Sequence, residues 1–207
     1  MSRLQALHLL LDVSGRWMLW NTILAWIPVL LAVALFRRRS DRRGPLWWVG
    51  VALFGLFLPN APYVVTDLVH VGPTVAWLGP GAPVATTVYP LYAVFVASGF
   101  VAYALALRMA GRYVTRIGLD HWRLPLRLGT HAVVAIGIFL GRWPRLNSWE
   151  PFTDPGQSLH RIGEALSWSR APLLIVVLFV VTAAGHFVTR AVLEALLTSA
   201  RRWRSHA

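Results

Sequence analysis

Asp67 and His70 stand three residues apart in the segment LFLPNAPYVVTDLVH, residues 56–70. On a helix this spacing places a carboxylate and an imidazole on one face. Together they are suited to ligate zinc or manganese, and a histidine oriented by a carboxylate is also suited to act as a general base without a metal. Asn60 and Tyr63 fall on the same face at helical spacing. We therefore predict a polar stripe that faces protein or a water-filled cavity.

A second polar cluster lies in the segment GIFLGRWPRLNSWEPF, residues 137–152. With Glu150 from this cluster as a third ligand, Asp67 and His70 would complete a site for a divalent metal. Such a site would define an enzyme that acts at the outer leaflet of the membrane on an anionic or lipid-linked substrate. The side chains that we expect to bind the substrate are Asn21, Asn60, Tyr63, Arg142, Asn147 and Ser148.

The same residues also allow an interpretation without catalysis. A pair between Asp67 and Arg142 would lock two helices together, so the polar layer would be structural. Asn60 lies between Pro59 and Pro62 and is suited to repair a proline break by bonding an unpaired carbonyl. This interpretation, which we favour, predicts an assembly protein whose partners are other membrane proteins or further copies of the same chain.

A third interpretation is an ion-coupled carrier that uses Asp67 and His70 as titrating groups. A carrier needs polar groups across the whole membrane, and His131 and His186 supply two of them on the other side. Each of these histidines lies about one helical turn from an arginine, which favours a position at the membrane interface. The sequence thus leaves open whether the protein is an enzyme, a carrier or an assembly protein.

The composition places all three interpretations in a membrane. Of 207 residues, 57% are hydrophobic and 14% are charged, which is typical of a polytopic membrane protein. The chain has no cysteine, which excludes disulfides, thiolate catalysis and cysteine-ligated metals. We predict a single all-α domain over residues 1–207, a bundle of transmembrane helices.

Five apolar runs are long enough to cross a bilayer. They cover residues 17–36, 46–71, 84–107, 124–142 and 172–190. Pro59 and Pro62 break the second run, and the part before them would rise only about 20 Å as a helix. The chain must therefore cross as a broken helix, or turn along the interface over residues 62–71.

Two further helices are expected outside the spans. Residues 4–13 are predicted to form a helix at the membrane interface, and a frayed terminus is the alternative. Residues 155–168 have the pattern of an amphipathic surface helix, with Asp154 as its N-cap and Gln157 at capping-box spacing. This second helix is suited to be a plain connector or a lid over the polar layer.

The net charge of +12 comes from clustered arginines, because the chain contains no lysine. The clusters lie in residues 37–43, 108–127 and 190–204, at the ends of apolar runs, where the positive-inside rule explains them without nucleic-acid binding. This topology places the N-terminus outside, the C-terminus in the cytoplasm, and Asn21 with both polar clusters at the outer face. The arginine-only usage is typical of a GC-rich bacterial genome, so we expect a bacterial inner membrane.

Three segments carry a family resemblance: WNTILAWIP, FLPNAPYVVTDLVH and GIFLGRWPRLNSWE. They resemble the signature segments of a bacterial membrane family known as domain of unknown function 1361, and the similarity extends from about residue 16 to the last span. The resemblance implies a compact helical inner-membrane protein and assigns no reaction and no catalytic residue. Glu150 stands where many relatives have an aspartate, which keeps the carboxylate and changes its reach.

Overall fold

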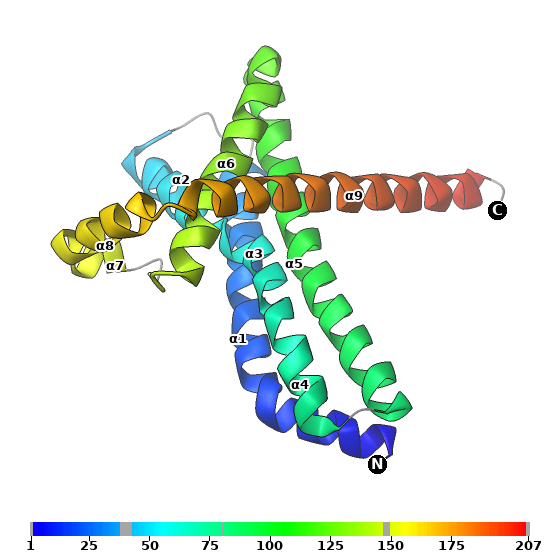
Figure 1. Ribbon diagram of the computed structural model, residues 1–207. Helices are drawn as coiled ribbons and strands as arrows, with labels where there is room; N and C mark the ends of the chain where they lie inside the picture. The colour runs from blue at the N-terminus through cyan, green and yellow to red at the C-terminus, as the bar shows by residue number, and fades with distance from the viewer. Residues whose placement is uncertain (1, 38–42, 80, 147–149, 206–207) are drawn as a thin grey trace.

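The computed structural model describes residues 2–37, 43–79, 81–146 and 150–205, which are helical or lie in short connections (Figure 1). No strand occurs in these four ranges. Five helical segments among them are long and apolar enough to cross a membrane. The prediction of an all-α bundle with five spans is therefore confirmed.

The first span is the helix α1, Arg3–Phe36. It begins with a capping box, in which the backbone N–H of Gln5 donates to the Ser2 hydroxyl and the Ser2 N–H donates to the Gln5 side chain. Residues 4–13 are helical as expected, but they continue directly into the span. Ser14 and Gly15, which follow them, do not end the helix, but the N-terminal part of α1 bends and lies at an angle to the rest of the span (Figure 1).

The second span is broken, as the two prolines predict. It consists of α2 (Pro45–Phe57), α3 (Asn60–Tyr63), the 3₁₀ helix η1 (Val64–His70) and α4 (Val71–Leu78). The helical path continues to Leu78, so residues 62–71 extend the span and do not turn away from it. Gly79 then ends the segment with φ 85°, a left-handed value that glycine adopts without strain.

The third span, α5 (Ala82–Arg116), lies alongside α1 and α4 (Figure 1). Gly99 lets α5 approach the break in the second span, because a Cβ at this position would overlap the Ala61 carbonyl oxygen and a Val64 methyl group. At the other end of α5, Arg116 donates to the Phe36 carbonyl of α1 at 3.2 Å. The third span therefore supports both the break and the end of the first span.

The fourth and fifth spans pack against each other. After the short 3₁₀ helix η2 (Asp120–Trp122), α6 (Arg123–Arg142) contacts α9 (Ala171–Ser205). Between them lie α7 (Glu150–Thr153) and α8 (Pro155–Ser167), the latter capped by Asp154, which accepts from the Gln157 N–H at 3.0 Å. The predicted cap is confirmed, and the second half of α9 extends away from the other helices (Figure 1).

The core and the surface are both apolar, as expected for a chain surrounded by lipid. Tyr92, Tyr103 and Phe139 are fully buried between helices. In contrast, Leu30 on α1 and Leu173 on α9 are more than 60% exposed, at 68% and 66%. Apolar side chains on both sides of a helix indicate that one side faces protein and the other faces hydrocarbon.

Candidate functional site

The break in the second span is stabilised by its own asparagine. Because Pro59 and Pro62 have no N–H, the regular hydrogen-bond ladder fails there, and the Ala61 N–H donates to the Leu58 carbonyl at 3.2 Å. The Asn60 side-chain amide donates to the Phe57 carbonyl at 3.0 Å. The predicted repair of the break by Asn60 is confirmed.

We expect the change Asn60→Ala to lower the free energy of unfolding by about 1 kcal/mol, because the Phe57 carbonyl would lose a donor in an apolar region. Thermal unfolding of the purified protein in detergent measures this change. Thr86→Ala is the control, because the Thr86 hydroxyl bonds the Ala82 carbonyl at an exposed position of a regular helix. Equal stability of the two variants would contradict the repair role.

A cavity of about 650 Å³ lies beside the break, between α1, α2, α3 and α6. Its size is that of a site for a small organic ligand. The residues that line it are Trp20, Asn21, Leu24, Ala52, Gly55, Leu56, Phe57, Pro59, Asn60, Tyr63, Val133, Ile136, Gly137, Leu140, Gly141, Leu146 and Ile162. We call this space the break pocket. Residues from all three segments that carry the family resemblance line this pocket.

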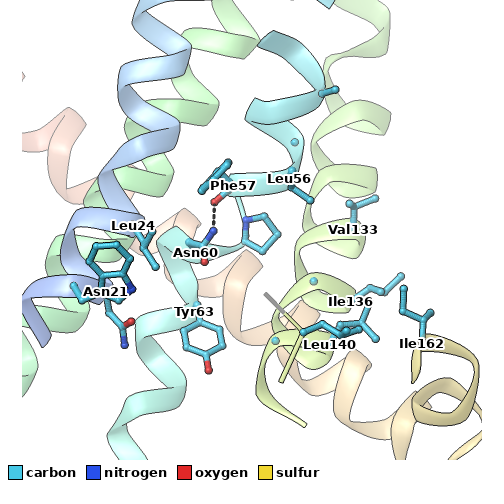
Figure 2. A pocket seen from close by; sticks show the side chains of 17 residues that line it. Asn21, Leu24, Leu56, Phe57, Asn60, Tyr63, Val133, Ile136, Leu140 and Ile162 are labelled. Carbon is cyan, nitrogen blue, oxygen red and sulfur yellow. Dashed lines mark hydrogen bonds between the residues drawn. The ribbon is translucent and has the colours of Figure 1, made fainter. Parts of the chain in front are cut away.

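The break pocket is amphipathic. The polar side chains of Asn21, Asn60 and Tyr63 come from α1 and α3, whereas α6 supplies an apolar wall that includes Ile136 and Leu140 (Figure 2). Two of its lining residues, Trp20 and Val133, are also 55% and 61% exposed on the outside of spanning helices. The pocket therefore reaches the outer surface of the helix bundle.

Two glycines of α6 shape the apolar wall, and sequence reasoning missed them. A Cβ at Gly137 would come within 2.6 Å of the Pro59 ring, and a Cβ at Gly141 would contact the Tyr63 ring at 3.4 Å. The spacing of four residues between small side chains is typical of closely packed membrane helices and was the available signal. These glycines bring α6 against the broken span.

Asp67 lies next to the break pocket and is buried, with 3% of its surface exposed. Its Oδ2 atom accepts a hydrogen bond of 2.9 Å from the Asn21 amide, so α1 and η1 are linked at this point. Arg142 interacts with Asp67 electrostatically, but no ion pair joins them within 4.0 Å. The predicted direct pair is wrong, because Asp67 faces α1 and bonds Asn21.

His70 does not share the burial of Asp67. Its side chain is exposed, and its ring lies 5.3 Å from the Trp17 ring. With three residues per turn, the 3₁₀ helix η1 keeps Asp67 and His70 on one face, where both meet α1, and turns this pair away from the face of Tyr63. The continuous stripe predicted from α-helical spacing is therefore broken after Tyr63, and only Asn60 and Tyr63 reach the pocket.

Glu150 has a different role from the one that we considered. Its carboxylate forms an ion pair of 2.9 Å with Arg161 of α8, and Arg161 also donates to the Pro144 carbonyl. The structure thus does not bring Glu150 to Asp67 and His70. Within the described ranges, no three histidine, aspartate or glutamate side chains form a group that could hold a metal ion. Asn147 and Ser148 lie outside those ranges.

His131 and His186, which we expected at the interface, are buried, with 3% and 6% of their surface exposed. Their rings lie 5.2 Å apart, and the Tyr103 hydroxyl is hydrogen-bonded to His131 Nδ1 at 2.8 Å. The interface prediction is wrong because α6 and α9 cross near α5, and this crossing covers both histidines.

The five long apolar helices, with the second one broken, define a multi-pass helical membrane protein. The chain belongs to the family described as protein of unknown function DUF1361, whose family model matches residues 20–184. This confirms the resemblance seen in the sequence. No curated protein and no solved structure matches the chain.

Proposed function

We propose that this protein binds an amphiphilic molecule, such as a lipid or a lipid-linked compound, in the break pocket. The observation that carries the proposal is the combination of amide and phenol groups on one wall with an apolar wall on α6, in a cavity that reaches the lipid-facing surface. An acyl or isoprenoid chain fits the apolar wall. A polar group that accepts and donates hydrogen bonds fits Asn21, Asn60 and Tyr63.

The helix α8 supports this proposal because it covers one edge of the pocket. Ile162 of α8 lines the cavity, whereas Leu159 on the same helix is 70% exposed and available to the bilayer. Arg161 holds α8 in place through Glu150 and the Pro144 carbonyl. Movement of this helix would widen the entrance, so we assign it the role of a lid.

The proposal includes a topology. The N-terminus lies outside, the C-terminus lies in the cytoplasm, and the membrane is a bacterial inner membrane. The distribution of arginines supports this orientation. Arg43 stacks over Trp47 and Tyr113, and Arg116 bonds the end of α1, so arginines from two segments gather at one end of the bundle. The break pocket then lies nearer the outer leaflet.

The change Gly55→Leu tests the proposal by filling the pocket. Gly55 lines the cavity, and a Cβ there has no heavy atom within 4 Å, so the larger side chain fits without a clash. We expect labelling of the pocket by a diazirine-bearing phospholipid in vesicles to fall at least about tenfold, because a lost contact of about 1.4 kcal/mol is a factor of ten in binding. Peptide mapping after irradiation measures the labelled positions.

The matched control is Gly129→Leu, which adds the same side chain to α6 at a position with open space and outside the pocket. Labelling of the pocket peptides should be unchanged in this variant. If Gly55→Leu and the wild-type protein are labelled equally in the pocket, the break pocket does not bind lipid.

A second candidate function is assembly, and the buried bond between Asn21 and Asp67 supports it. A buried polar link that joins α1 to η1 is suited to fix one arrangement of the helices. On this proposal the bilayer, other membrane proteins and further copies of the chain are the partners. Cross-linking in native membranes, followed by purification, would identify such neighbours, and a strictly monomeric protein without cross-linked neighbours would exclude it.

A further inference from the structure

A second cavity, of about 610 Å³, lies at the opposite end of α6 from the break pocket, between α5, α6 and α9. The residues that line it are Ala104, Leu107, Arg108, Ala110, Gly111, Arg112, Val114, Asp120, His121, Arg123, Leu124, Leu126, Arg127, Thr130, His186, Arg190, Leu193 and Glu194. We call this space the basic pocket. None of its residues lines the break pocket, so its role is independent of the proposed function.

The basic pocket has an excess of positive charge, because five arginines line it against two carboxylates. Arg190 pairs with Glu194 at 2.8 Å, and Arg123 approaches Asp120 at 3.7 Å. The other three arginines are Arg108, Arg112 and Arg127, and none of them forms an ion pair or hydrogen bond with another described residue.

Two of these arginines are partly shielded from solvent. Arg108 on α5 and Arg127 on α6 are only partly exposed, and both belong to helices that are otherwise apolar enough to cross a membrane. A guanidinium in such a position is costly unless an anion or a polar partner compensates it. Two of them directed at one cavity therefore point to an anionic ligand.

The deep wall of the basic pocket adds a buried polar group. His186 lines the cavity with 6% of its surface exposed, and its ring packs against His131 at 5.2 Å and Tyr103 at 5.8 Å. Tyr103 bonds His131, and neither ring nitrogen of His186 forms a hydrogen bond with another described residue. His186 thus offers a donor or acceptor at the bottom of a cavity whose rim is cationic.

We propose that the basic pocket binds a phosphoryl group. Guanidinium groups bind phosphate oxygens through parallel N–H donors, and the three arginines without an ion-pair partner come from two helices that converge on one cavity. The group can come from the head of an anionic phospholipid or from a soluble phosphate compound. Basic pockets between membrane helices are known to suit anionic head groups.

The test measures the midpoint of thermal unfolding of the purified full chain in neutral detergent. Short-chain phosphatidylglycerol should raise the midpoint. Short-chain phosphatidylcholine should raise it much less, because its choline cation is repelled by the arginines around the phosphate. In Arg108→Gln and Arg127→Gln, the apparent affinity for phosphatidylglycerol should fall about tenfold each, because a charge-assisted bond is lost. Arg170→Gln, at an exposed position outside the pocket, is the matched control for net charge and should bind normally.

A variant that is expected to bind phosphatidylglycerol more tightly keeps the test decisive if an arginine variant fails to fold. Glu194 lines the pocket and holds Arg190, so Glu194→Gln should release a cation and tighten binding several-fold. Inorganic pyrophosphate distinguishes the source of the phosphoryl group. Stabilisation by phosphatidylglycerol alone assigns the site to a lipid head group, and equal stabilisation by pyrophosphate assigns it to a soluble anion.

Three results would overturn the proposal. The first is that neither phosphatidylglycerol nor pyrophosphate stabilises the protein. The second is an equal loss of affinity in Arg170→Gln and Arg108→Gln, which would mean that net charge alone attracts the anion. Unchanged binding in Glu194→Gln, together with unchanged binding in Arg127→Gln, would equally place the ligand elsewhere.

Discussion

Replacing Gly99 with alanine is expected to lower the free energy of unfolding by about 2 kcal/mol or more, because overpacking a well-packed contact costs roughly 1 to 3 kcal/mol. The added Cβ would overlap the carbonyl oxygen of Ala61 and a methyl group of Val64. A backbone carbonyl cannot rotate away as a flexible side chain can. The third span must therefore move away from the break, and the break pocket should lose its shape. Thermal unfolding in detergent measures the loss.

Gly111→Ala is the control for this prediction. Gly111 lies in the same helix, and a Cβ there meets no heavy atom within 4 Å. Because alanine is the better helix former, this variant should be unchanged or more stable by about 0.5 to 1 kcal/mol. If Gly99→Ala is as stable as Gly111→Ala, the close approach of α5 to the broken span is not required.

The break in the second span was predictable, because it depends on local chemistry. Pro59 and Pro62 remove two backbone donors, and an asparagine between them is the natural donor for a freed carbonyl. The end of this span was not predicted correctly, since the helical path continues past residue 71 to Leu78. Pro73 does not end the path, because a proline in the first turn of α4 is compatible with a helix.

The polar stripe shows where periodicity alone fails. Its prediction assumed 3.6 residues per turn through His70, and the structure winds residues 64–70 as a 3₁₀ helix. Local winding of this kind is set by packing against α1 and α5, which the sequence of one segment does not encode. Asn60 and Tyr63 reach the pocket, whereas Asp67 and His70 face α1, where Asp67 bonds Asn21 and the His70 ring lies against Trp17.

The ionic partners were the least predictable feature. Arg142, Arg145 and Arg161 all lie near the same end of the molecule, and a sequence cannot decide which of them meets which carboxylate. In the structure, Arg161 forms an ion pair with Glu150, and the Asn21 amide donates a hydrogen bond to Asp67. The same limit applies to His131 and His186. Their burial depends on how α6 crosses α9, and the two histidines are 55 residues apart in the sequence.

The second large effect is expected at Asp67. The change Asp67→Ala should lower the free energy of unfolding by about 2 kcal/mol, because it leaves the Asn21 amide without the carboxylate that it bonds at 2.9 Å. In a double-mutant cycle with Asn21→Ala, the coupling energy should be about 1 to 2 kcal/mol. Asp12→Ala, which removes an exposed carboxylate from α1, is the control and should have no measurable effect.

The variant Asp67→Asn separates a structural carboxylate from a chemical one. An amide keeps the shape of the side chain and an oxygen that accepts from Asn21, so the bond between α1 and η1 should persist, and most of the stability with it. Labelling of the break pocket by lipid should also persist, because Asp67 does not line that pocket. A protein that uses Asp67 as a metal ligand, a general base or a proton site needs its charge, and would lose its activity in Asp67→Asn while remaining folded. If Asp67→Asn keeps its stability and its lipid labelling, Asp67 is a structural link. If it loses as much stability as Asp67→Ala, the negative charge of Asp67, acting on Arg142 or His70, holds the helices together.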